Sequence, residues 1–338
     1  MRSSNSGPRQ DGPTRNVSFH HESTKVSKVT KTNFCFSCAS FSSCASWLLF
    51  FVALGVCSPA RAQYEAPPFD SIHLAVPEIS QARDWYLKNM GGNVGETADR
   101  VGFGRWSGDH PLPLQLIFEV SVDAKPSSGS VIDSIGFSFD DLQVAVRELQ
   151  AAGVTVISPV VDDPGWWKHA VVEDPWGTRL ELVEDPDLLG LHHVNLRVRD
   201  PAASLAWYVR AFGGDRATVK GRDAIRYRDL GLFYLFAVKD ERAVPSVGHS
   251  IDHLAWGPLD LDKVVNDLKT LGVTFLSNPN PRGYPACNFV GGDSEGDTSA
   301  IRRLYCAQPD QLPHRIVFLD APDGVRVELV QHLEAGGH

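Results

Sequence analysis

The pattern of hydrophobic residues along residues 69–333 repeats four times. Each time, a stretch with apolar residues at alternate positions leads into a stretch with apolar residues every three or four positions, and further alternating stretches follow. Alternation is typical of strands, and the longer period is typical of amphipathic helices. The pattern predicts four modules, each with one strand, one helix and about three more strands, near residues 69–122, 130–185, 190–240 and 249–333.

Repeated segments support these modules, because duplicated units leave matching residues at matching places. A strand with a histidine and a helix ending near Trp-Tyr occur at 71–86 and 191–208. A strand and helix that run from Asp to Gly occur at 133–153 and 252–272, and a glycine turn with a strand occurs at 174–184 and 321–331. We therefore expect an α+β fold with curved mixed sheets and helices on one face.

The four modules predict two domains in chain order. The N-terminal domain is expected at 63–186 and the C-terminal domain at 187–338. The last module carries a polar insertion rich in proline and glycine at 277–313. Long irregular segments inside compact domains often cover functional sites, so we interpret the insertion as a cavity lid.

Residues 1–62 form a leader with a different composition. A polar stretch precedes the apolar run Trp47–Val56, and Ala60-Arg61-Ala62 follows it in the pattern of a signal-peptide cleavage site. The run is shorter than the roughly 20 residues that span a bilayer. We expect export to the periplasm or the medium after cleavage near Ala62, with no stable membrane span in the mature chain. A disordered tail with an apolar patch is the alternative.

Charge and cysteine content narrow the partners. The formal net charge is −9; the leader holds seven Lys or Arg and two Asp or Glu, so +5 lies there and −14 remains. This acidic body argues against nucleic-acid binding. A small-molecule substrate is expected, and a homodimer stays open. Beyond the leader only Cys287 and Cys306 remain of six cysteines, and whether they form a disulfide also stays open.

A paired module that begins H-h-x-h-x-V and closes G-x-x-h-E-L, where h is apolar, resembles the vicinal oxygen chelate (VOC) superfamily. This superfamily includes glyoxalase I, extradiol dioxygenases and bleomycin-resistance proteins. The resemblance covers nearly all of residues 69–333. It implies βαβββ modules paired around a cavity, and two such domains in tandem look most like the extradiol dioxygenases, in which the C-terminal domain carries a metal ion.

The resemblance also implies metal ligands on the first strand of each module and on the last strand of each pair. Carried over residue by residue, it gives His193, His253 and Glu328 as ligands in the C-terminal domain. Two imidazoles and a carboxylate suit Fe(II) first, with Mn(II), Zn(II) and Ni(II) as alternatives. The N-terminal domain has His73, Ser134 and Glu181 at matching places, and a serine is a poor substitute for an imidazole, so no metal is expected there.

The reaction depends on a fourth position. Glyoxalase-type sites add a glutamate from the last strand of the first module, and Tyr234 stands about there in the C-terminal domain. The missing carboxylate favours oxygenase chemistry such as extradiol ring cleavage, with Tyr234 and His314 as candidates for positioning substrate or moving protons. A glyoxalase-like lyase or isomerase, a non-catalytic binding protein and a metal that only stabilises the fold are the alternatives.

Overall fold

The computed structural model describes residues 66–95, 97–104, 114–228, 233–278, 287–290, 303–306 and 314–333. The predicted leader and most of the predicted insertion lie outside these residues. Four modules are present, three of them βαβββ and the fourth with one further strand, which confirms the predicted fold class. The first contains β1 (Phe69–Val76), α1 (Ile79–Asn89), β2 (Asn93–Val94), β3 (Arg100–Phe103) and β4 (Leu114–Val120); the second contains β5 (Ile132–Phe139), α2 (Leu142–Ala151), β6 (Thr155–Val161), β7 (His169–Glu173) and β8 (Arg179–Glu184).

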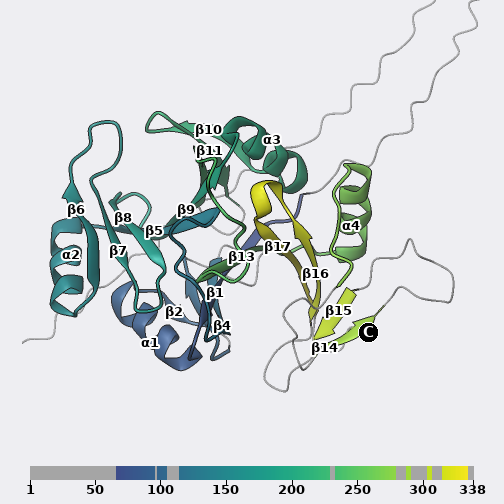
Figure 1. Ribbon diagram of the computed structural model, residues 1–338, viewed down its shortest axis with the longest axis horizontal. Coiled ribbons are helices and arrows are strands. Elements are labelled where there is room, and N and C mark those ends of the chain that lie inside the picture. The colour runs from purple at the N-terminus through teal and green to yellow at the C-terminus, as the bar shows by residue number, and fades with distance from the viewer. Residues whose placement is uncertain are drawn as a thin grey trace, which may run out of the picture. The chain divides into compact units, whose positions relative to one another are not determined.

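The third module repeats this order, and the fourth adds one strand to it (Figure 1). The third contains β9 (Gly190–Val198), α3 (Pro201–Phe212), β10 (Asp215–Val219), β11 (Arg222–Tyr227) and β12 (Phe233–Lys239). The fourth contains β13 (Ile251–Trp256), α4 (Leu261–Thr270), β14 (Cys287–Val290), β15 (Arg303–Cys306), β16 (His314–Asp320), a short 3-10 helix η1 (Pro322–Gly324) and β17 (Arg326–His332).

The modules do not pair in chain order. One sheet has nine strands in the order β14-β15-β16-β17-β13-β1-β4-β3-β2, and the other has eight in the order β10-β11-β12-β9-β5-β8-β7-β6. The first module therefore shares a sheet with the fourth, through the antiparallel pair β1–β13, and the second shares a sheet with the third, through β5–β9. The expected division between residues 186 and 187 falls inside the eight-stranded sheet.

A physical reason for this correction lies in the repeat itself. The first strand of each module can pair with the first strand of another module. All four first strands carry the same alternating pattern, so this pattern does not determine which two of them pair. Only residues 185–189 separate β8 from β9, which makes the second and third modules close neighbours along the chain. The first and fourth modules, which are far apart in the sequence, then pair with each other through β1 and β13.

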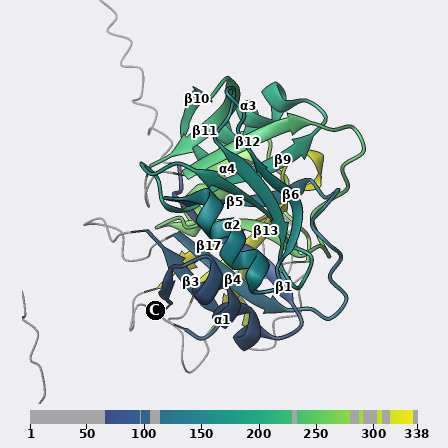
Figure 2. The ribbon, with the colours of Figure 1, turned by 90° about the vertical axis from the view of Figure 1, so that its left-hand side faces the viewer.

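Aspartates begin three of the four helices. Asp141, Asp200 and Asp260 adopt extended backbone angles, and each side chain accepts a hydrogen bond from the backbone N–H three residues later. This contact satisfies one of the free N–H groups at a helix start. Each helix then packs its apolar face on the strands of its own module; Figure 2 shows α2 in front of the eight-stranded sheet. The opposite faces of the sheets carry buried polar side chains together with two smaller apolar clusters.

A buried hydrogen bond ties the first module to the second. Tyr86 Oη on α1 donates to Asp174 Oδ2 at 2.8 Å, and burial raises the pKa of Asp174 to about 6. In the matching pair, Tyr208 lies on α3 and Ala321 stands where Asp174 would be. Tyr208 Oη is buried and has no hydrogen-bond partner among the residues that the structure describes. One copy of the repeat has therefore kept this bond and the other has lost it.

We expect Tyr86→Phe to lower the free energy of unfolding by about 1–2 kcal/mol, because Asp174 loses a buried donor. Tyr208→Phe is the matched control and should change stability little, since no such bond is removed. Urea unfolding at pH 7 of both variants and of the unchanged protein measures the difference. Equal losses in the two variants would contradict the assigned role of the Tyr86 hydrogen bond.

The cysteines beyond the leader lie on neighbouring strands. The antiparallel pair β14–β15 places the backbone of Cys287 opposite that of Cys306. Directly opposed residues in such a pair have Cα atoms about 4.5–5.5 Å apart, a separation that disulfides also use. The backbone register is therefore compatible with the disulfide, which stays a prediction.

No helix in the described ranges is long and apolar enough to cross a membrane.

Candidate metal centre

Four side chains converge on one face of the nine-stranded sheet. His73 on β1 and His253 on β13 are directly opposed across the antiparallel pair, and their rings stack with centroids 3.9 Å apart. Glu119 enters from β4 and Glu328 from β17, the strands on either side of this pair. Alternation turns Glu328 away from the core residues Val327 and Leu329, as expected from the sequence.

The distances within this cluster are short. His73 Nδ1 lies 2.8 Å from Glu119 Oε1, and His253 Nε2 lies 3.2 Å from Glu328 Oε2 and 3.9 Å from Glu119 Oε1. One ligand atom each of His73, His253 and Glu328 falls within 4.8 Å of the others. These residues are 5%, 0% and 4% exposed. Two imidazoles and two carboxylates held on four strands fit a divalent transition-metal ion.

The electrostatics of the cluster favour a cation. Burial alone would lower the pKa of His253, but the hydrogen bond to Asp252 and the nearby charges of Glu119 and Glu328 outweigh it and raise the pKa to about 9. Burial would raise the pKa of Glu328, and the contact with His253 lowers it below its ordinary value instead. In the metal-free protein the histidine proton balances the carboxylates, and a metal ion would displace that proton.

His193 lies elsewhere, so the predicted trio of His193, His253 and Glu328 is corrected. His193 is on β9 in the eight-stranded sheet, where its Nε2 lies 3.1 Å from Glu181 Oε2. The error follows from module pairing: β1, not β9, lies beside β13. The first histidine of the cluster is consequently His73, which the sequence assigned to a degenerate site.

The His193 cluster is the degenerate copy, and protein groups occupy its carboxylate. Trp166 Nε1 donates to Glu181 Oε1 at 2.8 Å, and Asn195 Nδ2 donates to Glu181 Oε2 at 2.6 Å. Asn195 also donates to Ser134 Oγ at 3.0 Å. Ser134 occupies the place that His253 has in the other sheet. The Glu181 carboxylate is therefore satisfied by hydrogen bonds from its own chain.

Aromatic side chains fill the space around the His193 cluster. Val238, not a carboxylate, stands where Glu119 stands in the intact cluster, because Arg197 lies opposite Val238 as Ala75 lies opposite Glu119. The Trp166 ring packs edge-on against Phe236, and the Arg222 guanidinium lies 3.7 Å from the centre of the Trp166 ring. Gly136 makes room for the imidazole, since a Cβ at this position would overlap the His193 ring.

Neither predicted acid–base residue belongs to the intact cluster. Tyr234 lies opposite His193 on β12 and packs near Trp167. His314 begins β16 and lies opposite His332, at the end of the strand away from the Phe318–Glu328 pair. Phe318, not a tyrosine, is the residue opposite Glu328.

Glu119 was missed from the sequence. The signal was present in Leu114–Val120, where Gln115, Ile117 and Glu119 alternate with core residues, so that Glu119 shares a face with the cluster. Pairing the third module with the fourth, as the sequence suggests, places the fourth ligand on β12. In the structure the first module pairs with the fourth, so the ligand comes from β4.

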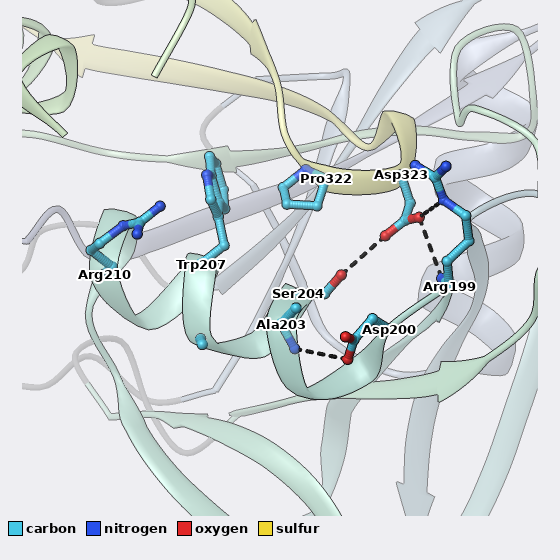
Figure 3. A pocket seen from close by; sticks show the side chains of 9 residues that line it. Arg199, Asp200, Ala203, Ser204, Trp207, Arg210, Pro322 and Asp323 are labelled. Carbon is cyan, nitrogen blue, oxygen red and sulfur yellow. Dashed lines mark hydrogen bonds and ion pairs between the residues drawn. The ribbon is translucent and has the colours of Figure 1, made fainter. Parts of the chain in front are cut away.

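A separate open pocket of about 570 Å³ lies between α3 and η1 (Figure 3). Arg199 Nε pairs with Asp323 Oδ1 at 2.7 Å, and Ser204 Oγ donates to Asp323 Oδ2 at 3.0 Å. In the first and second modules the equivalent space is filled, because Trp85 packs edge-on against Trp176. None of the pocket's lining residues belongs to either histidine cluster.

Comparison with known proteins agrees with this geometry. A family model described as the Glyoxalase/Bleomycin resistance protein/Dioxygenase superfamily matches residues 69–182 and 190–329. The chain belongs to this superfamily. A search of curated protein sequences found no significant match.

Among solved structures, glyoxalase I from Zea mays aligns with 19% identity over 79% of this chain and 92% of that one, at a TM-score of 0.54. A mutant form of the same maize enzyme aligns with 19% identity over 79% and 94% of the two chains, also at 0.54. A putative dioxygenase from Bacillus subtilis aligns with 15% identity over 80% and 87%, at 0.48. The maize structures share the fold of this chain.

Proposed function

We propose that this protein is a divalent-metal-dependent enzyme of glyoxalase-like lyase or isomerase type, acting on a small substrate with oxygens on adjacent carbons. The observation that carries the proposal is Glu119, which adds a second carboxylate to His73, His253 and Glu328. A three-ligand oxygenase site has no use for this group, whereas proton transfer next to a carbonyl needs a base beside the metal.

The four side chains divide the work. His73, His253 and the two glutamates would hold the ion, which supplies Lewis-acid polarisation of the substrate oxygens. Glu119 and Glu328 approach from opposite sides of the β1–β13 pair. Either glutamate would take a proton from the substrate carbon at an Oε atom and return it to the neighbouring carbon, while the hydroxyl proton moves between the two substrate oxygens.

One wall of the site is apolar. Ala255, Ile316, Phe318 and Val330 form a buried cluster, and both Ala255 and Phe318 pair directly with Glu328 in the sheet. The Phe318 ring meets the His253 ring edge-on at 5.6 Å. Such a wall excludes water, which strengthens the interactions of the charged side chains in the site.

Extradiol cleavage, the function favoured by the sequence, loses its supporting residues in this arrangement. Tyr234 and His314 lie outside the cluster, and Phe318 has no group that moves a proton. The glyoxalase-like alternative gains Glu119 in their place. The identity of the metal rests on the donor set alone, and two nitrogens with two carboxylate oxygens suit Zn(II) and Ni(II) as well as Fe(II).

We expect the metal-loaded full chain to catalyse hydrogen exchange or isomerisation on α-hydroxycarbonyl compounds, including thiol adducts of 2-oxoaldehydes. Incubation in deuterium oxide followed by NMR measures deuterium at the carbon beside the carbonyl, and a chelator should reduce it to background. Oxygen uptake with catechols and no exchange would instead support ring cleavage. Tight ligand binding without turnover would support a binding protein.

A further inference from the structure

Both imidazoles of the intact cluster have a carboxylate behind them. Asp252 Oδ1 lies 2.9 Å from His253 Nδ1, and both residues are fully buried. Asp252 can only accept, so His253 donates its Nδ1–H to it and presents Nε2 to Glu328 and Glu119, as the atom that would bind the metal. The backbone N–H of Gly248 holds the other oxygen of Asp252 at 3.0 Å.

The contact behind His73 runs through a hydroxyl. Ser71 Oγ donates to Asp70 Oδ2 at 2.8 Å and lies 3.2 Å from His73 Nε2. Because the Ser71 proton is directed at Asp70, the serine oxygen is free to accept the Nε2–H of His73. The Nδ1 atom of His73 then faces the cluster, 2.8 Å from Glu119 Oε1, where a metal ion would replace the proton shared with the carboxylate. Asp70 itself is anchored by His332, whose Nε2 lies 3.1 Å from Asp70 Oδ1.

The degenerate copy lacks both arrangements. Asp133 stands where Asp252 stands and also accepts a hydrogen bond from a turn glycine, Gly129, at 3.4 Å. Its carboxylate, however, pairs with Arg197 Nε at 2.8 Å and with Arg179 at 3.3 Å. The outer nitrogen of His193 meets another imidazole, His192 Nδ1, at 2.8 Å. Both aspartates therefore accept a hydrogen bond from a turn glycine, and of the two only Asp252 contacts a histidine ring.

We propose that Asp252, and Asp70 acting through Ser71, are positioning residues that fix which nitrogen of His253 and of His73 faces the metal. The inference rests on the proposed metal-dependent function. Outer carboxylates of this kind orient a ligating imidazole and make it a better electron donor. The cluster is thereby set for a metal ion before the ion arrives.

The test is the affinity of the full chain for Zn²⁺ alone, measured by competition with a chromophoric chelator. Asp252→Asn is expected to weaken binding 10–100-fold, because an amide at this position cannot accept from both His253 and Gly248. Ser71→Ala, a smaller change that removes a single hydroxyl, should weaken it about 10-fold. The matched control is Asp133→Asn, which perturbs the equivalent turn and should leave the affinity within about 3-fold.

A second readout separates orientation from general damage. In the Zn²⁺-loaded protein, ¹⁵N–¹H spectra of the histidine rings should show His253 protonated at Nδ1, and Asp252→Asn should shift or broaden this signal while thermal stability follows that of Asp133→Asn. Unchanged Zn²⁺ affinity in both Asp252→Asn and Ser71→Ala overturns the positioning roles alone. Failure of the unchanged protein to bind any divalent metal overturns the proposed function as well.

Discussion

Replacing His73 with alanine is expected to abolish stoichiometric metal binding, whereas replacing His193 is expected to leave it intact. His73 supplies one of the two imidazoles of the four-residue cluster, and its loss leaves two buried carboxylates with one nitrogen. His193 lies in the other sheet, where Glu181 and its hydrogen-bond donors surround it. Elemental analysis of the full chain after reconstitution with Zn²⁺ or Ni²⁺ measures the difference.

Near one equivalent of metal is expected in the unchanged protein, and much less in His73→Ala, His253→Ala and Glu328→Ala. Glu181→Ala and His193→Ala are the matched controls, because they remove a buried carboxylate and a buried imidazole from the degenerate copy. Metal lost from His193→Ala but retained by His73→Ala would restore the trio predicted from the sequence. It would also show that the first and fourth modules do not form the functional pair.

Glu181→Gln is expected to lower the free energy of unfolding at pH 7 by about 3 kcal/mol. Burial disfavours the charged form of Glu181, but contacts with His193, Trp166 and Asn195 outweigh this and lower its pKa from 4.5 to about 2. A carboxylate whose pKa is lowered in the folded state stabilises the protein above its unfolded pKa. That contribution is lost as the pH falls from about 4.5 towards 2.

Urea unfolding at several pH values between 7 and 3 tests this prediction. The difference between the unchanged protein and Glu181→Gln should be largest at pH 7 and should shrink below pH 4.5. Glu241→Gln is the control, because Glu241 is exposed and its ion pair with Lys239 contributes little. A difference that stays constant with pH would mean that the carboxylate charge of Glu181 does not contribute to stability.

Local features of this chain were predictable and long-range pairing was not. The helix starts at Asp141, Asp200 and Asp260 follow from local hydrogen bonding, and the position of Glu328 on the cavity face follows from strand alternation. His193 was misplaced because the sequence comparison equated it with His73, whereas the strand register puts Asn195 at the place of His73. Which of two equivalent strands lies beside β13 is decided by contacts between modules, and a repeating pattern carries no information about that choice.

Glu119 illustrates the same point from the opposite direction. Alternation within β4 shows which face of the sheet Glu119 lies on, but its partners His253 and Glu328 lie far along the chain on β13 and β17. Ser134 is a poor substitute for an imidazole, and Asn195 lies opposite Ser134 as His73 lies opposite His253. Only the sheet order shows that they belong to the same copy as His193, so that the losses gather in one cluster and the other cluster keeps all four side chains.

The pairing of the first module with the last determines when the centre can form during synthesis. His73 is made well before Glu328, so the centre stays incomplete while the second and third modules are made. The contact between Asp70 and His332 closes a separation of 262 residues. A chain that is released before β17 is made keeps an unpaired β13 edge and lacks the carboxylate of Glu328. Metal retention therefore distinguishes chains that contain β17 from chains that end before it.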